Sequence, residues 1–193
     1  MTEGYAAFDD PYLYPGTAVL RNRLDLRDPR QLEAFEVEMT TARAAEPLPV
    51  GRFGPAHYRR LHRHLFQDVY AWAGCYRTVR TAKGDNVFCY PEHIPAQMDA
   101  LFACLGTLPF TGGANFALFI AGAARFLGEI NAIHPFREGN GRIQLLFVHQ
   151  VAQRAGHPLD LSRVRRDSFL PAMIESFHQH LAPLVEEMTR LRA

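Results

Sequence analysis

A nine-residue stretch, HPFREGNGR at residues 134–142, constrains the fold of this chain more than any other part of its sequence. It follows a run of mostly apolar residues with helical spacing, and a second helical pattern begins at about Asn140. Its proline, glycine and asparagine residues interrupt helical periodicity, and its charged residues are not those that a packed core favours. The stretch therefore predicts a helix, a short polar loop and a second helix, with chemistry at their junction.

Helical periodicity recurs along most of the chain and predicts a mainly α protein. Asp28 before Pro29 is a typical helix start, with aspartate as the N-cap and proline in the first turn. That helix should end before Glu46-Pro47. Further helices are expected at about residues 56–73, 95–105, 115–133, 140–155, 165–180 and 182–191, with a loop at 107–113.

One stretch has the pattern of strands. The sequence YRTVRTAKGDNVFCY, residues 76–90, alternates apolar and polar residues around Gly84-Asp85-Asn86. Such alternation about a short turn is typical of a β-hairpin. It is the only good strand candidate in the sequence.

Composition narrows the class of protein. The chain has 193 residues, of which 48% are hydrophobic, which suits one domain with a small appendage. With 21 basic and 20 acidic residues, it gives no electrostatic reason to expect nucleic acid or a membrane as a partner. The three cysteines show no metal-ligand spacing, the first residues do not resemble a signal peptide, and polar residues interrupt the apolar run at 116–133. We therefore expect a soluble cytoplasmic protein.

The second half of the polar stretch has the residues of a phosphate site. A helix that begins near Asn140 presents unpaired N–H groups and the positive end of its dipole, both of which attract anions. Gly139 and Gly141 let a ligand approach the backbone closely. Arg142 adds a fixed charge and a fork of donors suited to phosphate. Together they predict a cradle for a phosphate chain.

The first half supplies reactive groups. His134, at the end of the preceding helix, is a candidate general base, because histidine titrates near neutral pH. Glu138 would repel phosphate unless a cation lay between them, and Mg²⁺ is the expected cation. Taken singly, His134 reads as a loop residue and the glycines as a turn, while Phe136 should anchor the loop in the core. The joint pattern favours transfer of a phosphorus-containing group from a nucleotide to a hydroxyl.

These residues resemble a known signature. HPFREGNGR is similar to HxFx(D/E)GNGRxxR, the motif of the Fic family, and the stretches YLYPGTAVLRNRLDL, LHRHLFQDVYAWAG and YRTVRTAKGDNVFC are similar to bacterial Fic toxins and effectors. The resemblance covers roughly residues 10–185 and implies a Fic-type helical bundle with one β-hairpin, the flap. It divides the chain into an N-terminal arm, residues 1–27, and a catalytic domain, residues 28–193.

The resemblance also implies an activity. Most Fic proteins transfer AMP from ATP, with Mg²⁺, to a Ser, Thr or Tyr hydroxyl of a target protein. By position, the roles would be general base for His134, Mg²⁺ ligand for Glu138, anion hole for Gly139, Asn140 and Gly141, and phosphate binding for Arg142. The flap, residues 77–90, would dock a target segment as an added strand, with Lys83 and Phe88 as contacts.

The chain departs from the signature at its last position, where Leu145 replaces the second arginine. Leucine cannot bind phosphate, so three outcomes stay open: weaker binding of the terminal phosphate, another arginine in its place, or another donor. The candidate replacements are Arg21, Arg23, Arg77 and Arg80. The alternative functions are a Fic-fold transferase that uses UTP, GTP or a phosphocholine donor, and a non-catalytic interaction module.

Regulation is expected to follow the toxin class of the family. The inhibitory (S/T)xxxE(G/N) motif of many Fic proteins is not found in this sequence. The toxin class lacks it too and relies on a separate small antitoxin protein. The resemblance thus predicts an antitoxin as a partner, and delivery of the protein into another cell stays open.

Overall fold

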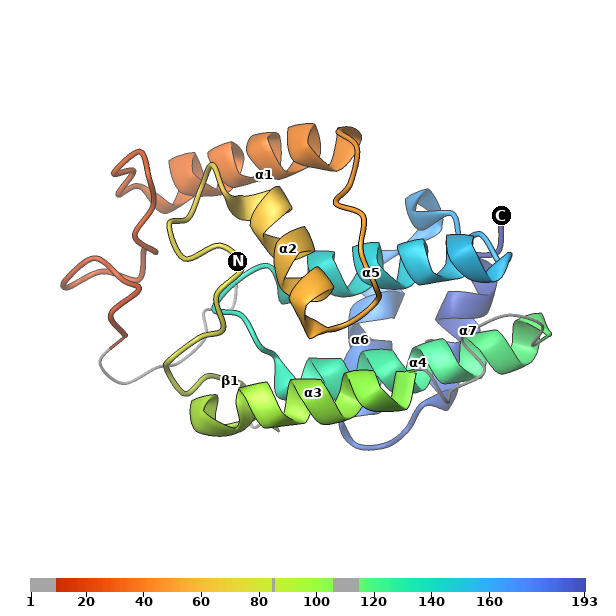
Figure 1. The fold of residues 1–193 in the computed structure, drawn as a ribbon. Helices are drawn as coiled ribbons and strands as arrows, with labels where there is room; N and C mark the ends of the chain where they lie inside the picture. Colours follow the sequence, from red (N-terminus) through yellow and green to blue (C-terminus); the bar gives the residue numbers. More distant parts are fainter. Residues whose placement is uncertain (1–9, 85, 106–114) are drawn as a thin grey trace. The chain divides into compact units, whose positions relative to one another are not determined.

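Seven α-helices and one two-stranded sheet make up most of the regular structure in the computed structural model, which describes residues 10–84, 86–105 and 115–193 (Figure 1). The described chain forms two compact units. The first comprises the described residues up to Glu92 together with Pro135–Gly139, and the second comprises His93–His134 and Asn140–Ala193. This confirms the mainly α fold with one hairpin, while the predicted loop at 107–113 lies outside the described residues.

The first unit is built on two packed helices, α1 (Pro29–Ala45) and α2 (Pro55–Phe66). Asp28 caps α1 as predicted, because its carboxylate accepts the N–H groups of Arg30 and Gln31. Helix α2 buries one face, which consists of His57, Tyr58, Leu61, His62, Leu65 and Phe66.

The predicted helix at 56–73 is too long, because α2 ends at Phe66. The chain then turns back through residues 67–75, and Gly74 takes a left-handed φ of 82°. In this turn the Trp72 ring stacks on Tyr70 at 4.4 Å and on His62 at 6.1 Å. Apolar side chains that matched a helical stripe in the sequence therefore reach the same core from a turn. Periodicity alone could not distinguish this turn from a longer helix.

The predicted hairpin is present but short. Strand β1 (Ala82–Lys83) pairs antiparallel with β2 (Asn86–Val87), with Ala82 opposite Val87 and Lys83 opposite Asn86. Asn86, expected in the turn, belongs to the second strand, and Gly84 supplies the positive φ of 56° that the turn requires. A short 3₁₀ helix, Pro91–His93, follows the hairpin.

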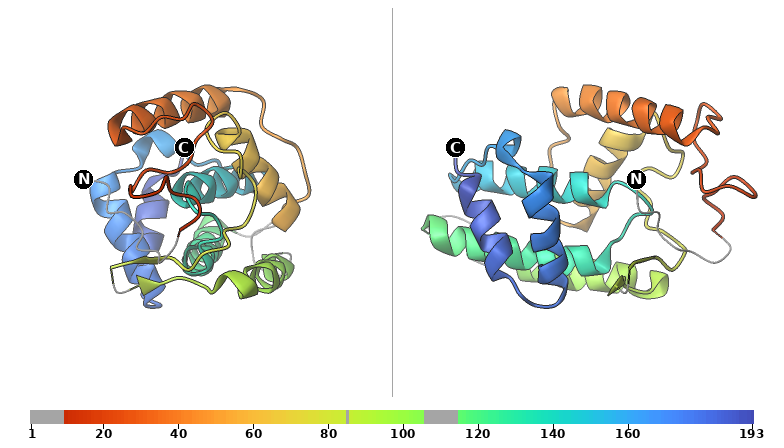
Figure 2. Two further views of the ribbon diagram at one scale, coloured as in Figure 1. Left: turned by 90° about the vertical axis from the view of Figure 1, so that its left-hand side faces the viewer. Right: turned by 180° about the vertical axis from the view of Figure 1, so that it is seen from behind.

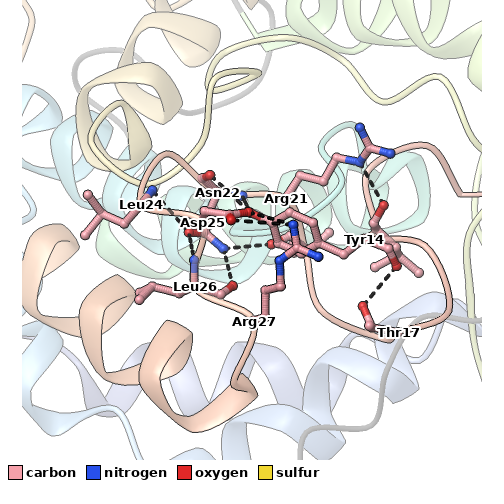
Figure 3. Close-up of polar contacts among 10 residues, drawn as sticks. Tyr14, Thr17, Arg21, Asn22, Leu24, Asp25, Leu26 and Arg27 are labelled. Carbon is pink, nitrogen blue, oxygen red and sulfur yellow. Dashed lines mark hydrogen bonds and ion pairs between the residues drawn. The ribbon is translucent and has the colours of Figure 1, made fainter.

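The described part of the N-terminal arm is organised by one asparagine (Figure 3). The Asn22 side chain donates to the carbonyls of Leu20 and Leu26 and accepts the N–H groups of Leu24 and Leu26. An antiparallel bridge between Leu13 and Leu20 closes the preceding turn. Side-chain hydrogen bonds thus replace regular secondary structure in this segment.

The second unit is built around α4 (Phe116–Ile133), which packs against α3 (Ile94–Leu105), α5 (Asn140–Ala155), α6 (Arg166–Phe177) and α7 (Ala182–Arg190) (Figures 1 and 2). Phe102, Phe126 and Phe147 bring α3, α4 and α5 together, with ring centroids 5.4–5.5 Å apart. These bounds agree with the predicted ranges to within a few residues. A short 3₁₀ helix, Leu161–Arg163, precedes α6.

Helix α4 is also long and apolar enough to cross a membrane by length and composition alone, with a mean hydropathy of 1.5. The core helix of a folded unit passes the same test, and 56% of α4 is buried within the structure. Its contacts with four other helices account for its apolar composition.

Candidate active site

The backbone of residues 134–139 is shaped by two left-handed residues at its ends. Helix α4 ends at Ile133, and His134 follows with φ 48° and ψ 62°. Gly139 has a φ of 83°, and α5 begins at the next residue, Asn140. A left-handed conformation costs a non-glycine residue about 1–2 kcal/mol, and such residues cluster at functional sites. At His134 this conformation ends α4 and turns the chain into the polar loop.

His134, the predicted general base, lies in the second unit and is 6% exposed. Its N–H donates to the Ile130 carbonyl at 2.9 Å, which closes the last turn of α4. The backbone thus fixes the position from which the imidazole projects. A fixed and largely desolvated histidine suits proton transfer, because little reorganisation is needed.

Asn140, Gly141 and Arg142, the predicted phosphate-binding residues, form the first turn of α5 in the same unit. Asn140 is buried, Arg142 is half-buried and Gly141 is exposed. A Cβ placed on Gly141 would meet nothing within 4 Å, so there is open space beside this turn. The first turn of α5 contains no acidic residue. A phosphate group would meet the positive end of a helix dipole there.

Glu138 and Gly139 belong to the first unit. The Glu138 carboxylate is half-buried, and its Oε1 accepts the Gly139 N–H at 2.8 Å. In the described chain, no three His, Cys, Asp or Glu side chains lie close enough together to hold a metal ion. A carboxylate of this kind nevertheless fits Mg²⁺, which binds through one or two carboxylates and completes its shell with phosphate and water.

Long-range contacts fix the 135–139 loop inside the first unit. Phe136 is fully buried and stacks on His62 at 3.8 Å and on Tyr58 at 5.7 Å. Burial raises the pKa of the Tyr58 phenol well above its usual range, which keeps that ring neutral. Arg137 forms a buried ion pair with Asp10, with Nε 2.6 Å from Oδ2. The anchoring role predicted for Phe136 is therefore confirmed.

The sequence did not indicate that Asp10, Arg137, Arg77 and His62 support this loop. His62 is fully buried and satisfied. Asp10 and Arg137 are 127 positions apart, and no local pattern links them. The one hint in the sequence was Arg137, a charged residue inside the motif to which no chemical role was assigned.

Of the four arginines considered as replacements for the missing one, Arg77 is excluded. It is 2% exposed, and its guanidinium donates to the carbonyls of Val79 at 2.6 Å and Cys89 at 2.5 Å. Its backbone N–H donates to the Pro135 carbonyl at 2.9 Å. Arg77 therefore supports the hairpin and the 135–139 loop instead of binding phosphate.

The other three arginines are exposed. The Arg80 guanidinium lies over the Tyr90 ring, 4.1 Å from its centroid, and donates a hydrogen bond to the Tyr90 hydroxyl. Arg21 and Arg23 line a cavity of about 330 Å³ beside Trp72 and Tyr12. Leu145, at the position of the missing arginine, is half-buried on α5.

The two predicted flap residues differ in exposure. Lys83, in β1, is half-buried, whereas Phe88, just after β2, is 6% exposed and donates its N–H to the Thr81 carbonyl. Burial raises the pKa of the neighbouring Cys89 thiol. Val87, at 53%, is the more exposed apolar side chain of the hairpin. Contact of Lys83 and Phe88 with a target stays a prediction.

Comparison with known proteins gives a consistent match. Residues 52–152 match the model of the Fic/DOC family. The chain is 51% identical over 188 residues to the probable protein adenylyltransferase y4lH of Sinorhizobium fredii, a match that covers 97% of this chain and 98% of that one.

Solved structures agree with the sequence match. The fold is similar to that of the BepC effector of Bartonella tribocorum, solved with bound AMPPNP, with a TM-score of 0.84, 25% identity and coverage of 94% of this chain and 96% of that one. It is also similar to the Fic domain of a Bep effector from Bartonella quintana, solved with bound ADP, with a TM-score of 0.84, 27% identity and 94% coverage of both chains.

Proposed function

This chain belongs to the Fic/DOC family, and we propose that it is a protein adenylyltransferase that moves AMP from ATP to a side-chain hydroxyl of a target protein. The name of the Sinorhizobium fredii relative and the nucleotides bound in the two similar structures support this activity. One observation carries the proposal: buried His134 is held left-handed at the end of α4, and the Asn-Gly-Arg turn that opens α5 begins six residues later.

The reaction balances with a single base. The target hydroxyl oxygen forms a bond to the α-phosphorus of ATP, and the bond from that phosphorus to the pyrophosphate oxygen breaks. His134 takes the hydroxyl proton, and pyrophosphate leaves with the electron pair. This scheme needs no covalent enzyme intermediate.

The first turn of α5 would bind the phosphates. Its N–H groups and the Arg142 guanidinium are donors that would stabilise developing negative charge on the phosphate oxygens. Asn140 adds a side-chain amide from the same turn. These groups would stabilise the charge that moves onto the phosphate oxygens during transfer.

The Glu138 carboxylate would hold Mg²⁺ together with phosphate oxygens of the nucleotide. When bound, the ion would neutralise phosphate charge. Hydrogen bonds within the first unit hold both the Glu138 carbonyl and its carboxylate, which supports this proposed role.

The partners follow from the same proposal. The hydroxyl belongs to a Ser, Thr or Tyr of a target protein, whose backbone would add as a strand beside the hairpin β1–β2. A small antitoxin protein would restrain the activity in the cytoplasm. Lys83, on β1, would contact the target segment.

Labelled ATP tests the activity. We expect transfer of label from the α-phosphorus and none from the γ-phosphorus, and His134→Ala should reduce transfer by at least about 100-fold. His180→Ala, a change at an exposed histidine paired with Glu175, is the matched control and should leave transfer unchanged. Undiminished transfer by His134→Ala would refute its assignment as the base.

Leu145 makes the choice of donor a separate question. A panel of ATP, UTP, GTP and a phosphocholine donor answers it, and we expect ATP to be preferred. Strong transfer from another donor with none from ATP would show that the chain is a Fic-fold transferase for a group other than AMP. Failure of every Mg-nucleotide to bind in calorimetry would indicate a non-catalytic interaction module.

A further inference from the structure

His62, on α2, is a fully buried histidine enclosed by aromatic rings. Its ring stacks on Phe136 at 3.8 Å, on Phe66 at 4.7 Å and on Trp72 at 6.1 Å. A buried polar ring needs hydrogen-bond partners for both nitrogens, because an unmet donor or acceptor costs about 1–3 kcal/mol. The partners of His62 therefore decide its role.

Both partners are backbone groups, which fixes the tautomer. The Gly74 N–H donates to Nδ1 at 2.9 Å, and Nε2 lies 3.0 Å from the Glu138 carbonyl oxygen. A backbone amide can only donate and a carbonyl can only accept. Nδ1 is therefore unprotonated, and Nε2 carries the hydrogen that it donates to Glu138.

The bond to Glu138 acts on one particular peptide group. The carbonyl of Glu138 and the N–H of Gly139 belong to the same peptide bond. His62 holds the carbonyl, and the Glu138 carboxylate accepts the N–H at 2.8 Å. Rotation of this peptide group would break both hydrogen bonds, and glycine at Gly139 makes such rotation sterically easy.

We propose that His62 is a positioning residue for the transfer reaction: its Nε2–H fixes the Glu138–Gly139 peptide group and so sets the direction of the Glu138 carboxylate that would hold the metal. The effect on the reaction rests on the proposed function. The hydrogen bonds of His62 lie entirely within the first unit. Phe66, one helical turn after His62, packs under Gly139 and supports the same peptide group.

A pair of amide variants separates the two hydrogen bonds of His62. In His62→Gln the amide nitrogen can reach the place of Nε2 and donate to Glu138. In His62→Asn the amide oxygen can take the place of Nδ1 and accept from Gly74. Each variant loses one bond and much of the ring stacking, so a merely structural histidine would give two similar variants.

Calorimetry of Mg-dependent nucleotide binding reads the difference without needing transfer. We expect His62→Asn to weaken binding at least about tenfold, the usual scale for groups that orient a metal ligand, and His62→Gln to weaken it less than about threefold. In transfer assays the same split should appear in the KM for Mg-ATP and not in the KM for the target. Equal losses in the two variants would overturn the proposal.

Ring nitrogen chemical shifts of the unmodified protein test the geometry alone. At neutral pH we expect the hydrogen of His62 on Nε2, and a hydrogen on Nδ1 would overturn the proposal even if every variant failed to fold. If the unmodified protein binds Mg-nucleotide without transferring AMP, the proposed function fails. The ratio of the Mg-nucleotide affinities of His62→Asn and His62→Gln still decides the role of His62.

Discussion

At the scale of single residues, Gly139 is the position of the motif where the backbone and its surroundings both exclude a side chain. Its φ of 83° is left-handed, and a Cβ there would overlap the Phe66 ring. Gly16 has a similar φ of 71°, but a Cβ on it would meet nothing within 4 Å. An alanine at Gly16 would therefore cost only the strain of a left-handed backbone, whereas an alanine at Gly139 would add steric overlap with Phe66.

We predict that Gly16→Ala lowers the free energy of unfolding by about 1 kcal/mol, the cost of a left-handed alanine. Gly139→Ala should cost about 1–3 kcal/mol more, because the Phe66 ring has to move within a packed core. Urea denaturation measures both. Equal losses of unfolding free energy in the two variants would mean that the Phe66 ring moves aside without an energetic cost.

Leu145 is the residue that departs from the family signature, and restoring arginine tests what it changes. We predict that Leu145→Arg raises the affinity for Mg-ATP about tenfold, as a charge-assisted bond to the terminal phosphate would, and leaves AMP affinity unchanged. Leu146→Arg, at a neighbouring half-buried position on α5, is the control. Equal gains for AMP and ATP would contradict a role at the terminal phosphate.

At the scale of elements, the predictable parts are those with local signals. Asp28-Pro29 predicted the start of α1, and helical spacing predicted the start of α4 at about Asn115, whose side chain caps it by accepting the Leu118 N–H. The end of α2 was mispredicted because Val69 and Trp72 continue the helical spacing of apolar residues although they lie in the turn after the helix.

That turn is tied to α1 by an ion pair that predicts a pH dependence. Arg43 binds Asp68 through two nitrogens, with Nε 2.5 Å from Oδ2 and Nη2 2.9 Å from Oδ1, and these hydrogen bonds lower the pKa of the Asp68 carboxyl. Because the folded pKa lies below the unfolded value of about 3.9, the unfolded chain binds more protons as pH falls. The contribution is complete above the unfolded pKa and is lost as pH falls through the folded one.

We predict that Asp68→Asn lowers stability by about 1 kcal/mol near neutral pH, since the pair is partly exposed. Thermal melts of both proteins between pH 7 and pH 3 should show a Tm difference that is constant above about pH 5 and shrinks below about pH 4. A difference that does not depend on pH would show that the ion pair is not its source.

The hairpin depends on Arg77, which the sequence presented as one of several arginines. Arg77→Met should leave the carbonyls of Val79 and Cys89 unpaired, at about 1–3 kcal/mol each. We predict that hydrogen exchange of the Phe88 amide, which bonds Thr81, becomes at least about tenfold faster, whereas Arg80→Met changes it less than about threefold. Similar exchange in the two variants would contradict this role.

At the scale of the whole molecule, the sequence predicts which residues react, but it does not predict the contacts that hold their loop. His134, Glu138 and the Asn-Gly-Arg turn lie in one short segment, and its spacing alone predicts the chemistry proposed for them. The supports of the 135–139 loop come from Asp10, His62 and Arg77, and these pairings depend on tertiary structure that no local pattern encodes.

Metal removal tests the molecule as an enzyme. We predict that a chelator stops AMP transfer and that added Mg²⁺ restores it, because one half-buried carboxylate and the phosphates would share the ion. Glu138→Gln should raise the Mg²⁺ concentration for half-maximal transfer at least about tenfold without lowering Tm by more than a few degrees. Full activity in the chelator would contradict the role of Glu138.

Tandem mass spectrometry of proteins incubated with the chain, ATP and Mg²⁺ identifies the transferred group and the residue that receives it. We expect AMP joined to a Ser, Thr or Tyr hydroxyl with the unmodified chain and no such product with His134→Ala. A phosphate or another nucleotide at that hydroxyl, or an AMP product that survives His134→Ala, would contradict this expectation.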